Sequence, residues 1–288
     1  NITMIQLRNV IKDYENIDIE FVDIRKKMHE FSESFGQTVT DRQENRLYSG
    51  EFTLTIYFRL FIAELFPELD KAVYIDSDTV INDDIAKLYS VDMGDAMFGA
   101  VRDTFAGKNT ILAHYIENVV GIERNEYVNS GVLVMNLDKM RRTHLADIFL
   151  KLMAEYHFDS VAPDQDYINA ICAKDIYFLD KEWNVMPNKG GEYMARPKLI
   201  HFNLFDKPWH YSEIPYEEYF WQYAAESGFY PLLIKQREQY GDSERSADRE
   251  NLKKLLARAE NIADGDGVKF SDVVGSGSFA GDNILEEI

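Results

Sequence analysis

Cysteine is almost absent from this chain of 288 residues, which contains only Cys172. A single thiol excludes an intramolecular disulfide, and it excludes any metal site that several cysteines would build. Chains without disulfides are typical of reducing compartments, so we expect the protein to be cytoplasmic.

Basic side chains are also scarce relative to acidic ones. The sequence has 31 Lys and Arg against 50 Asp and Glu, which gives a formal net charge of -19. This excess of negative charge argues against nucleic acid as a partner, and it limits contact with anionic membranes to peripheral contact at most. No uninterrupted apolar run approaches the roughly 20 residues needed to cross a bilayer. The composition makes no prediction about the oligomeric state.

What the sequence does contain is an alternation of short apolar runs and amphipathic segments. The runs are rich in β-branched and aromatic residues, as strands are, and the amphipathic segments have the spacing of helices. This alternation predicts an α/β fold, with a sheet flanked by helices. We predict strands over residues 17–24, 72–75, 96–101, 131–135, 176–179 and 198–200, and helices over residues 2–14, 53–66, 83–89, 138–156, 164–173, 215–227, 231–240 and 247–263.

The chain divides into three parts by composition. The alternation of strands and helices lies within residues 1–212. Residues 213–263 contain only helical patterns, and we predict a helical C-terminal extension there. Residues 264–288 are interrupted by Gly and Ser, so we expect a mobile tail.

The most informative stretch is the predicted strand at residues 72–75, which leads into Asp76, Ser77 and Asp78. Residues two apart on an extended chain point to the same side, so the two carboxylates can converge on one point. Carboxylates that close repel each other unless a proton or a cation lies between them. A hard divalent cation that also binds phosphate oxygens suits this pair, because ligands of α/β proteins gather at the carboxyl ends of strands.

An Asp-x-Asp pair has other interpretations, and acidic pairs at turns are often only structural. The sequence DSDTVI also matches the signature of haloacid-dehalogenase-type phosphatases, which depend on Mg²⁺. In such an enzyme Asp76 would be the nucleophile and Asp78 the general acid and base. The signature requires a second acidic pair after a lysine-bearing strand. Asp164 and Asp166 are the best candidates for that pair, and no clear strand of this kind precedes them.

Three further segments place polar residues at the ends of predicted elements. These are YVNSGVLVMNL, with Asn129, Ser130 and Gly131 before an apolar strand, PDQDYIN, with Asp164, Gln165 and Asp166 at a helix start, and IHFNLFDKPWH, with His201 at a strand end and Lys207 in a loop. A helix start offers free backbone N–H groups and polar side chains to a ligand. Each segment also has a structural interpretation, because Asp164 can cap its helix and His201 can be a hydrogen-bonded structural residue.

Taken together and in this order, the four segments resemble glycosyltransferase family 8. These retaining, metal-dependent nucleotide-sugar transferases include the glycogenins and bacterial lipopolysaccharide galactosyl- and glucosyltransferases. The resemblance extends over about residues 17–210, and it includes TIYFRL, which contains Arg59, and RDTF, which contains Asp103. It implies a Rossmann-like, nucleotide-sugar-binding mixed sheet of the GT-A type over residues 1–212. It also implies transfer of a hexose (galactose or glucose) from a UDP-sugar to a glycan or lipopolysaccharide-like acceptor.

The resemblance also implies a metal site and a group that stabilises the leaving phosphate. Asp76, Asp78 and His201 would hold Mn²⁺ or Mg²⁺ beside the diphosphate of the UDP-sugar. Two carboxylates and an imidazole suit Mn²⁺ best. Lys207 would neutralise the phosphate that leaves.

For the sugar, the resemblance places Gln165 near the anomeric carbon and keeps Asp164 as the alternative nucleophile. An amide is a poor nucleophile, so the implied route is front-face transfer, in which the leaving phosphate assists the acceptor hydroxyl. The other donor-binding residues that the resemblance implies are Arg59, Asp76, Ser77, Asp103, Asn129, Ser130, Gly131 and Lys207.

Two departures from the family pattern lead to expectations of their own. Leu204 stands where the family usually has a small glycine after the histidine, which puts the geometry of the phosphate loop in question. The family's first strand–helix–strand unit, which holds the nucleotide base, has no counterpart in residues 1–16. We therefore expect an open groove beside the Asp76 strand and weak binding of nucleotide diphosphates. A non-catalytic nucleotide-sugar-binding protein is the third interpretation, since it would keep the fold without turnover.

Overall fold

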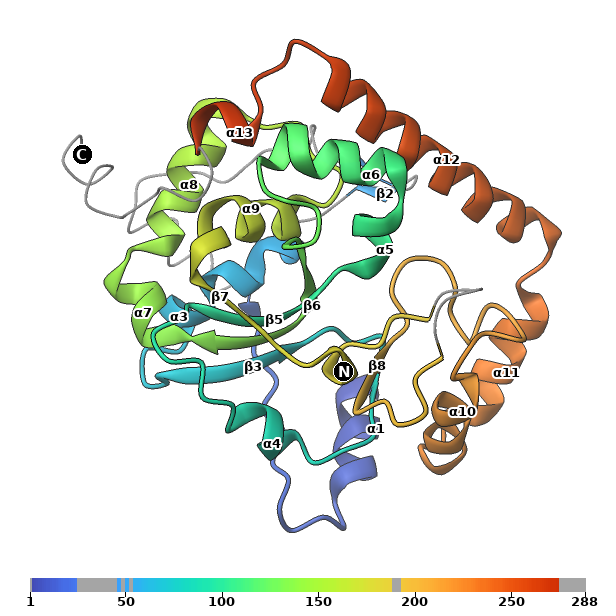
Figure 1. Ribbon diagram of the computed structural model, residues 1–288. Coiled ribbons are helices and arrows are strands. Elements are labelled where there is room, and N and C mark those ends of the chain that lie inside the picture. The colour runs from blue at the N-terminus through green and yellow to red at the C-terminus, as the bar shows by residue number, and fades with distance from the viewer. Residues whose placement is uncertain (1, 25–45, 48–49, 52–53, 188–192, 275–288) are drawn as a thin grey trace.

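The computed structural model describes residues 2–24, 46–47, 50–51, 54–187 and 193–274, and a four-stranded sheet lies at its centre (Figure 1). The strand order is β3–β6–β5–β7, with β6 antiparallel to β3 and to β5, and β7 parallel to β5. The strands are β3 (Lys71–Ile75), β5 (Phe98–Arg102), β6 (Val128–Asn136) and β7 (Ile176–Phe178), with two small pairs, β1 (Arg46–Leu47) with β2 (Gly50–Glu51) and β4 (Thr79–Ile81) with β8 (Leu199–His201). The prediction of a mixed sheet flanked by helices is confirmed.

Both faces of the sheet are covered, and the pleat of β6 explains how. Eight of its nine residues are buried. Leu133 and Met135 belong to the larger core, and Val132 and Val134 belong to a second core on the opposite face. Successive side chains of a strand point to opposite faces, so a continuous apolar run can serve both cores.

The larger core lies under most of the helices, and the second lies under α4 (Ile85–Tyr89) (Figure 1). Above the larger core are η1 (Leu54–Phe61), α3 (Ile62–Leu65), α5 (Thr104–Lys108), α6 (Thr110–Tyr115), η2 (Ile116–Val120), α7 (Leu137–Arg142), α8 (Leu145–Tyr156) and α9 (Pro163–Cys172). Two short segments flank β7, η3 (Ala173–Asp175) before it and η4 (Lys181–Trp183) after it. The sheet therefore presents its strand ends, rather than its faces, to ligands.

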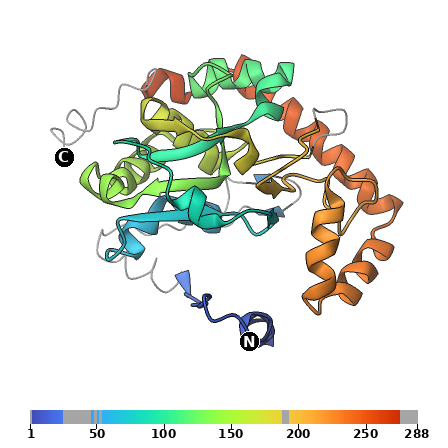
Figure 2. The ribbon, with the colours of Figure 1, turned by 60° about the horizontal axis from the view of Figure 1, so that its bottom comes forward.

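The prediction of a strand over residues 17–24 is wrong. After α1 (Ile2–Ile11) the chain runs through turns and irregular backbone, and Ile17 is 46% exposed. Figure 2 shows α1 and this segment apart from the sheet. Alternating apolar residues form a strand only when a partner strand accepts their backbone hydrogen bonds, and no described strand lies beside this segment.

Two predicted helices have a different form. The pattern over residues 138–156 is interrupted, because α7 ends at Arg142 and His144 adopts a left-handed backbone conformation (φ 53°). The Thr143 hydroxyl donates to the Lys139 carbonyl at 2.8 Å, so it satisfies a carbonyl at the end of α7. The pattern over residues 53–66 forms the 3₁₀ segment η1, which then continues as α3.

The C-terminal helices are α10 (Glu217–Glu226), α11 (Tyr230–Gln239), α12 (Asp242–Asp264) and α13 (Phe270–Val273). Helix α12 packs along α6, and its Leu255, Ala259 and Ala263 belong to the larger core (Figure 1). The expectation of a mobile tail from residue 264 is wrong for residues 265–274. Phe270 of α13 is fully buried, with its ring 4.2 Å from that of Phe158. The rest of that predicted tail, residues 275–288, lies outside the described residues.

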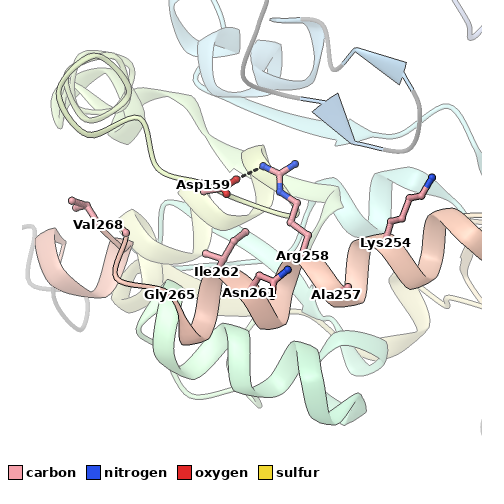
Figure 3. A pocket seen from close by; sticks show the side chains of 9 residues that line it. Asp159, Lys254, Ala257, Arg258, Asn261, Ile262, Gly265 and Val268 are labelled. Atoms are coloured by element: carbon pink, nitrogen blue, oxygen red, sulfur yellow. Dashed lines mark hydrogen bonds and ion pairs between the residues drawn. The ribbon is translucent and has the colours of Figure 1, made fainter.

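A hollow of about 490 Å³ lies between α12 and the segment before α9 (Figure 3). Arg258 of α12, one of the basic residues that line the hollow, forms an ion pair with Asp159 on its other side. The polar motifs of the sequence contribute no residue to its lining.

Within the described residues, no helix combines the length and the apolar composition that a membrane crossing requires.

Candidate active site

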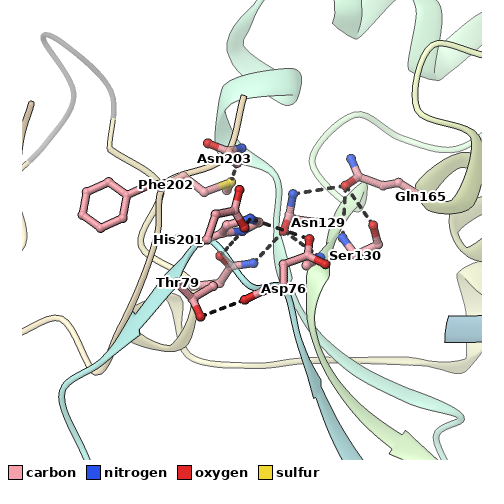
Figure 4. A network of polar contacts seen from close by, with 12 residues as sticks. Asp76, Thr79, Asn129, Ser130, Gln165, His201, Phe202 and Asn203 are labelled. Carbon is pink, nitrogen blue, oxygen red and sulfur yellow. Dashed lines mark hydrogen bonds and ion pairs between the residues drawn. The ribbon is translucent and has the colours of Figure 1, made fainter. Parts of the chain in front are cut away.

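The β4–β8 pair brings Asp76, Asp78 and His201 together. Figure 4 shows Asp76 and His201 at this place. Asp76 follows β3, Asp78 precedes β4, and His201 ends β8. One ligand atom from each residue lies within 4.8 Å of the other two. The Nε2 atom of His201 is 3.3 Å from Oδ1 of Asp78 and 3.7 Å from Oδ2 of Asp76. Antiparallel pairing of Thr79 with His201 sets this geometry, so the predicted ligands converge at the end of β3.

Gly131 leaves the space in which two of these side chains lie. A Cβ atom on Gly131 would be 2.2 Å from Cε1 of His201 and 2.7 Å from Oδ2 of Asp76. Both distances are far below van der Waals contact, so no other residue fits beside the ligands without moving them. The resemblance places Gly131 among the donor-binding residues, and in the structure it lies against two of the predicted metal ligands.

Each carboxylate of the pair also has a protein cation beside it. Nη2 of Arg59 donates to Oδ1 of Asp76 at 3.1 Å, and Nζ of Lys207 contacts Asp78 and the carbonyl of Phe202. Burial alone would raise the pKa of Asp78, but His201 and Lys207 outweigh it and lower that pKa. The carboxylate of Asp78 is therefore charged at neutral pH and attracts cations.

A chain of amides supports the imidazole of His201 from behind. Nδ1 of His201 lies 3.1 Å from Oδ1 of Asn184, whose Nδ2 donates to Oδ1 of Asn129 at 2.8 Å. The Asn184 oxygen can only accept, so Nδ1 donates to it, and Nε2 is the nitrogen that faces the two carboxylates. Asn129 in turn donates to Oε1 of Gln165 at 3.1 Å. The predicted sugar-binding residues and the predicted metal ligands thus form one connected network.

Gln165 is held at both ends of its amide. Its Oε1 accepts from the backbone N–H of Ser130 at 3.0 Å, and its Nε2 donates to Oδ2 of Asp103 at 3.2 Å. Asp103 follows β5 and caps α5, where its Oδ1 accepts from the Ala106 N–H at 2.9 Å. The predicted donor-binding residues therefore join the end of β5 and the start of β6 to the first turn of α9.

Arg59 connects these residues to the predicted metal ligands. It donates to the carbonyl of Ser130 at 2.6 Å, and its Nε lies 3.1 Å from Oδ2 of Asp164 without the alignment of a hydrogen bond. Burial lowers the pKa of Arg59, but Asp164 and Asp76 outweigh it and raise that pKa. Burial raises the pKa of Asp164, against the opposing effects of Arg59 and of the Ser130 hydroxyl, which donates to it at 2.8 Å.

Asp166 lies apart from the ligands, within the protein. It is completely buried and accepts from the hydroxyls of Tyr115 at 2.6 Å, Tyr127 at 2.6 Å and Ser160 at 2.5 Å. Three donors satisfy this carboxylate, and they fix the first turn of α9, which carries Asp164 and Gln165. A phosphatase would need Asp164 and Asp166 as a metal-binding pair, and the structure does not support that arrangement.

Two loop residues named in the sequence analysis, Ser77 and Leu204, have different environments in the structure. Ser77, between the two acids, is exposed. Leu204 adopts a left-handed backbone conformation (φ 54°), which an L-residue enters at a cost of about 1–2 kcal/mol. The chain thus keeps, with a leucine, a backbone conformation that glycine enters freely.

Two residues that support the site, Tyr74 and Asn184, were not predicted from the sequence. The hydroxyl of Tyr74 donates to Oδ1 of Asp76 at 2.6 Å, and the guanidinium of Arg59 lies 4.4 Å above the Tyr74 ring. Tyr74 and Asp76 are two residues apart on one strand, so the period of a strand could have revealed this contact. Asn184 gave no comparable signal, because it follows η4 as an isolated amide among apolar residues.

The sheet and the position of the acid pair at a strand end are those of a GT-A-type glycosyltransferase. Among solved structures, the bifunctional glycosyltransferase WbbM has a TM-score of 0.64 at 22% identity, over 83% of this chain and 44% of its own. An active-site mutant of LgtC has a TM-score of 0.53 at 18% identity, over 84% of this chain and 94% of its own. These likenesses establish the fold.

Residues 4–213 match the family described as Glycosyl transferase family 8. The chain belongs to this family. Similar proteins include a glycosyltransferase of Haemophilus influenzae, 29% identical over 135 residues (47% of this chain and 40% of that protein). General stress protein A of Bacillus subtilis is 25% identical over 229 residues (70% and 78%), and lipopolysaccharide 1,2-glucosyltransferase of Escherichia coli is 25% identical over 185 residues (59% and 54%). The chain thus spans 40% of the first relative's length and about half of the third's.

Proposed function

We propose that this glycosyltransferase moves a hexose, galactose or glucose, from a UDP-sugar to a glycan or lipopolysaccharide-like acceptor, with retention and with Mn²⁺ or Mg²⁺. The observation that carries the proposal is the convergence of Asp76, Asp78 and His201, with His201 joined to Gln165 through the hydrogen bonds of Asn184 and Asn129. A similar protein of Escherichia coli is a lipopolysaccharide glucosyltransferase, which supports this class of acceptor.

The three side chains fit a divalent cation. Two carboxylates and one imidazole are a mixed oxygen and nitrogen set that Mn²⁺ accepts, and Asn184 directs the free nitrogen of His201 toward the acids. The absence of a side chain on Gly131 leaves the room that His201 and Asp76 themselves occupy. An ion held here would neutralise charge on the diphosphate of the donor.

Lys207 supplies a second positive charge at the same place. Its ammonium contacts Asp78, and it is largely buried. Because Lys207 contacts Asp78, one of the predicted metal ligands, we expect it to stabilise the diphosphate charge that develops during cleavage of the sugar–phosphate bond. Stabilisation that grows toward the transition state lowers the barrier and raises turnover more than it raises donor affinity.

The contacts of Gln165 favour the front-face route. The oxygen and the nitrogen of its amide are already hydrogen-bonded to the protein. Gln165 can therefore bind and orient the sugar, but it is not available as a nucleophile. Asp164 is engaged by Arg59 and Ser130, which compete for the electron pairs that a nucleophile would need. In the proposed reaction the leaving phosphate accepts the proton of the acceptor hydroxyl, and the sugar is transferred on the face from which the phosphate leaves.

Hydrolysis of a panel of nucleotide sugars, with Mn²⁺ or with EDTA, tests the proposal. We expect a UDP-hexose to be hydrolysed only with the metal, and its sugar to be released first with retained configuration in ¹H NMR. Lys207→Ala should lower kcat more than it raises KM. Release of phosphate from aryl phosphates without any sugar would favour the phosphatase, and metal-dependent UDP-hexose binding without turnover would favour the non-catalytic binding protein.

A further inference from the structure

The turn that carries Lys207 is short and well defined. The carbonyl of Lys207 accepts from the backbone N–H groups of His210 and Tyr211, each at 2.9 Å. One helical turn therefore joins Lys207, at the site, to Tyr211, on the side of the C-terminal helices. A displacement of Tyr211 would move Lys207, because these hydrogen bonds connect them directly.

Asp248 of α12 holds the far end of this turn. Its Oδ2 accepts from the hydroxyl of Tyr211 at 2.7 Å and from the hydroxyl of Tyr240 at 2.6 Å. Tyr240 immediately follows α11, so one carboxylate ties the turn to two helices. Hydrogen bonds to a charged acceptor are stronger than neutral ones, and this oxygen receives two.

Ring contacts hold the middle of the turn. The ring of His210 stacks on that of Tyr240, with the centroids 3.9 Å apart and the planes 5° from parallel. The ring of Trp209 lies 5.0 Å from that of Phe220 in α10. The turn is thus packed against α10 and the end of α11 and hydrogen-bonded to α12, which is more support than a surface loop usually has.

We propose that Asp248 is a positioning residue for catalysis, which acts through Tyr211 to fix Lys207 beside Asp78. The inference rests on the proposed function, because Lys207 matters to turnover only if a phosphate leaves beside it. It gives the C-terminal extension a role in the reaction, although α12 contributes no residue to the site itself.

Amide hydrogen exchange and kinetics of the full chain test this role. In Asp248→Ala, exchange at residues 209–211 should rise about tenfold while exchange in β6 stays unchanged, since a lost anchor frees only the turn. With a UDP-hexose and Mn²⁺, kcat should fall about tenfold and KM should change less than about twofold. Asp248→Asn keeps an acceptor oxygen for Tyr211 and should restore most of kcat. Glu250→Ala, which removes an exposed carboxylate from the same helix, is the control.

A double-mutant comparison separates positioning from general stability. If Asp248 acts through Lys207, then Asp248→Ala should change kcat by less than about twofold in the Lys207→Ala background. Equal losses in both backgrounds, or unchanged exchange at residues 209–211, would overturn the proposal. If the wild-type chain hydrolyses no nucleotide sugar, the proposed function fails, and the role of Asp248 in catalysis fails with it. If Lys207→Ala is impaired while Asp248→Ala is not, only the role of Asp248 is rejected.

Discussion

Gly131→Ala is the smallest change that should disturb the proposed metal site. The added methyl group would lie 2.2 Å from Cε1 of His201, so His201 would have to move by more than about 1 Å to reach ordinary contact. His201 is held by Asn184, and the backbone of Gly131 accepts from the Asp76 N–H at 2.8 Å. Overpacking of such a site costs about 1–3 kcal/mol. Displacement of two ligands should also weaken Mn²⁺ binding by about tenfold or more.

Urea unfolding and Mn²⁺ titration followed by electron paramagnetic resonance measure the two effects. Val132→Ala is the matched control, because Val132 is the next residue of β6 and packs on the opposite face of the sheet. It should destabilise the fold by roughly 2 kcal/mol through a cavity and leave Mn²⁺ affinity unchanged. Wild-type Mn²⁺ affinity in Gly131→Ala would refute the reasoning, since it would mean that His201 and Asp76 do not hold the ion in this arrangement.

Three other predictions concern stability. Burial raises the pKa of Glu64 to about 7. At pH values between its ordinary pKa and 7, unfolding therefore releases a proton, and the free energy of unfolding falls as the pH rises. In urea titrations, Glu64→Gln should gain about 2 kcal/mol of stability relative to the wild type between pH 5 and pH 8, and a difference that stays constant over this range would contradict the prediction. Phe270→Ala should lower the free energy of unfolding by about 3–5 kcal/mol, whereas an unchanged value would mean that α13 does not pack on the core. Leu204→Gly should raise the melting temperature by the equivalent of about 1 kcal/mol, because it relieves a left-handed leucine, and a lower melting temperature would show that the leucine side chain outweighs the strain.

The residues that converge in the candidate site could be predicted because their signals are local. Asp76 and Asp78 follow an apolar strand, Asp164 and Gln165 begin a helix, and His201 ends a strand. Each signal needs only a few neighbouring residues and the tendency of α/β sheets to gather ligands at strand ends. The structure adds how these ends meet, through the pairing of β4 with β8.

What could not be predicted depends on contacts between distant segments. Asn184 is important only because it lies between His201 and Asn129, and no local pattern marks it. The alternation of residues 17–24 satisfied the period of a strand but said nothing about whether a partner strand was present. The burial of Phe270 was hidden by the glycines and serines around it, because one aromatic residue can anchor a segment of low apolar density.

Binding of Mn²⁺ to the purified chain tests the central claim most directly. Loss of the free-ion signal in electron paramagnetic resonance should show one Mn²⁺ per wild-type chain, and Asp78→Asn should lower the affinity by about a hundredfold. Asp83→Asn removes a carboxylate that lies beyond β4 in the sequence and pairs with Lys87, and it should bind Mn²⁺ as the wild type does. Equal affinity in Asp78→Asn and the wild type would contradict the assignment of Asp76, Asp78 and His201 as the metal site.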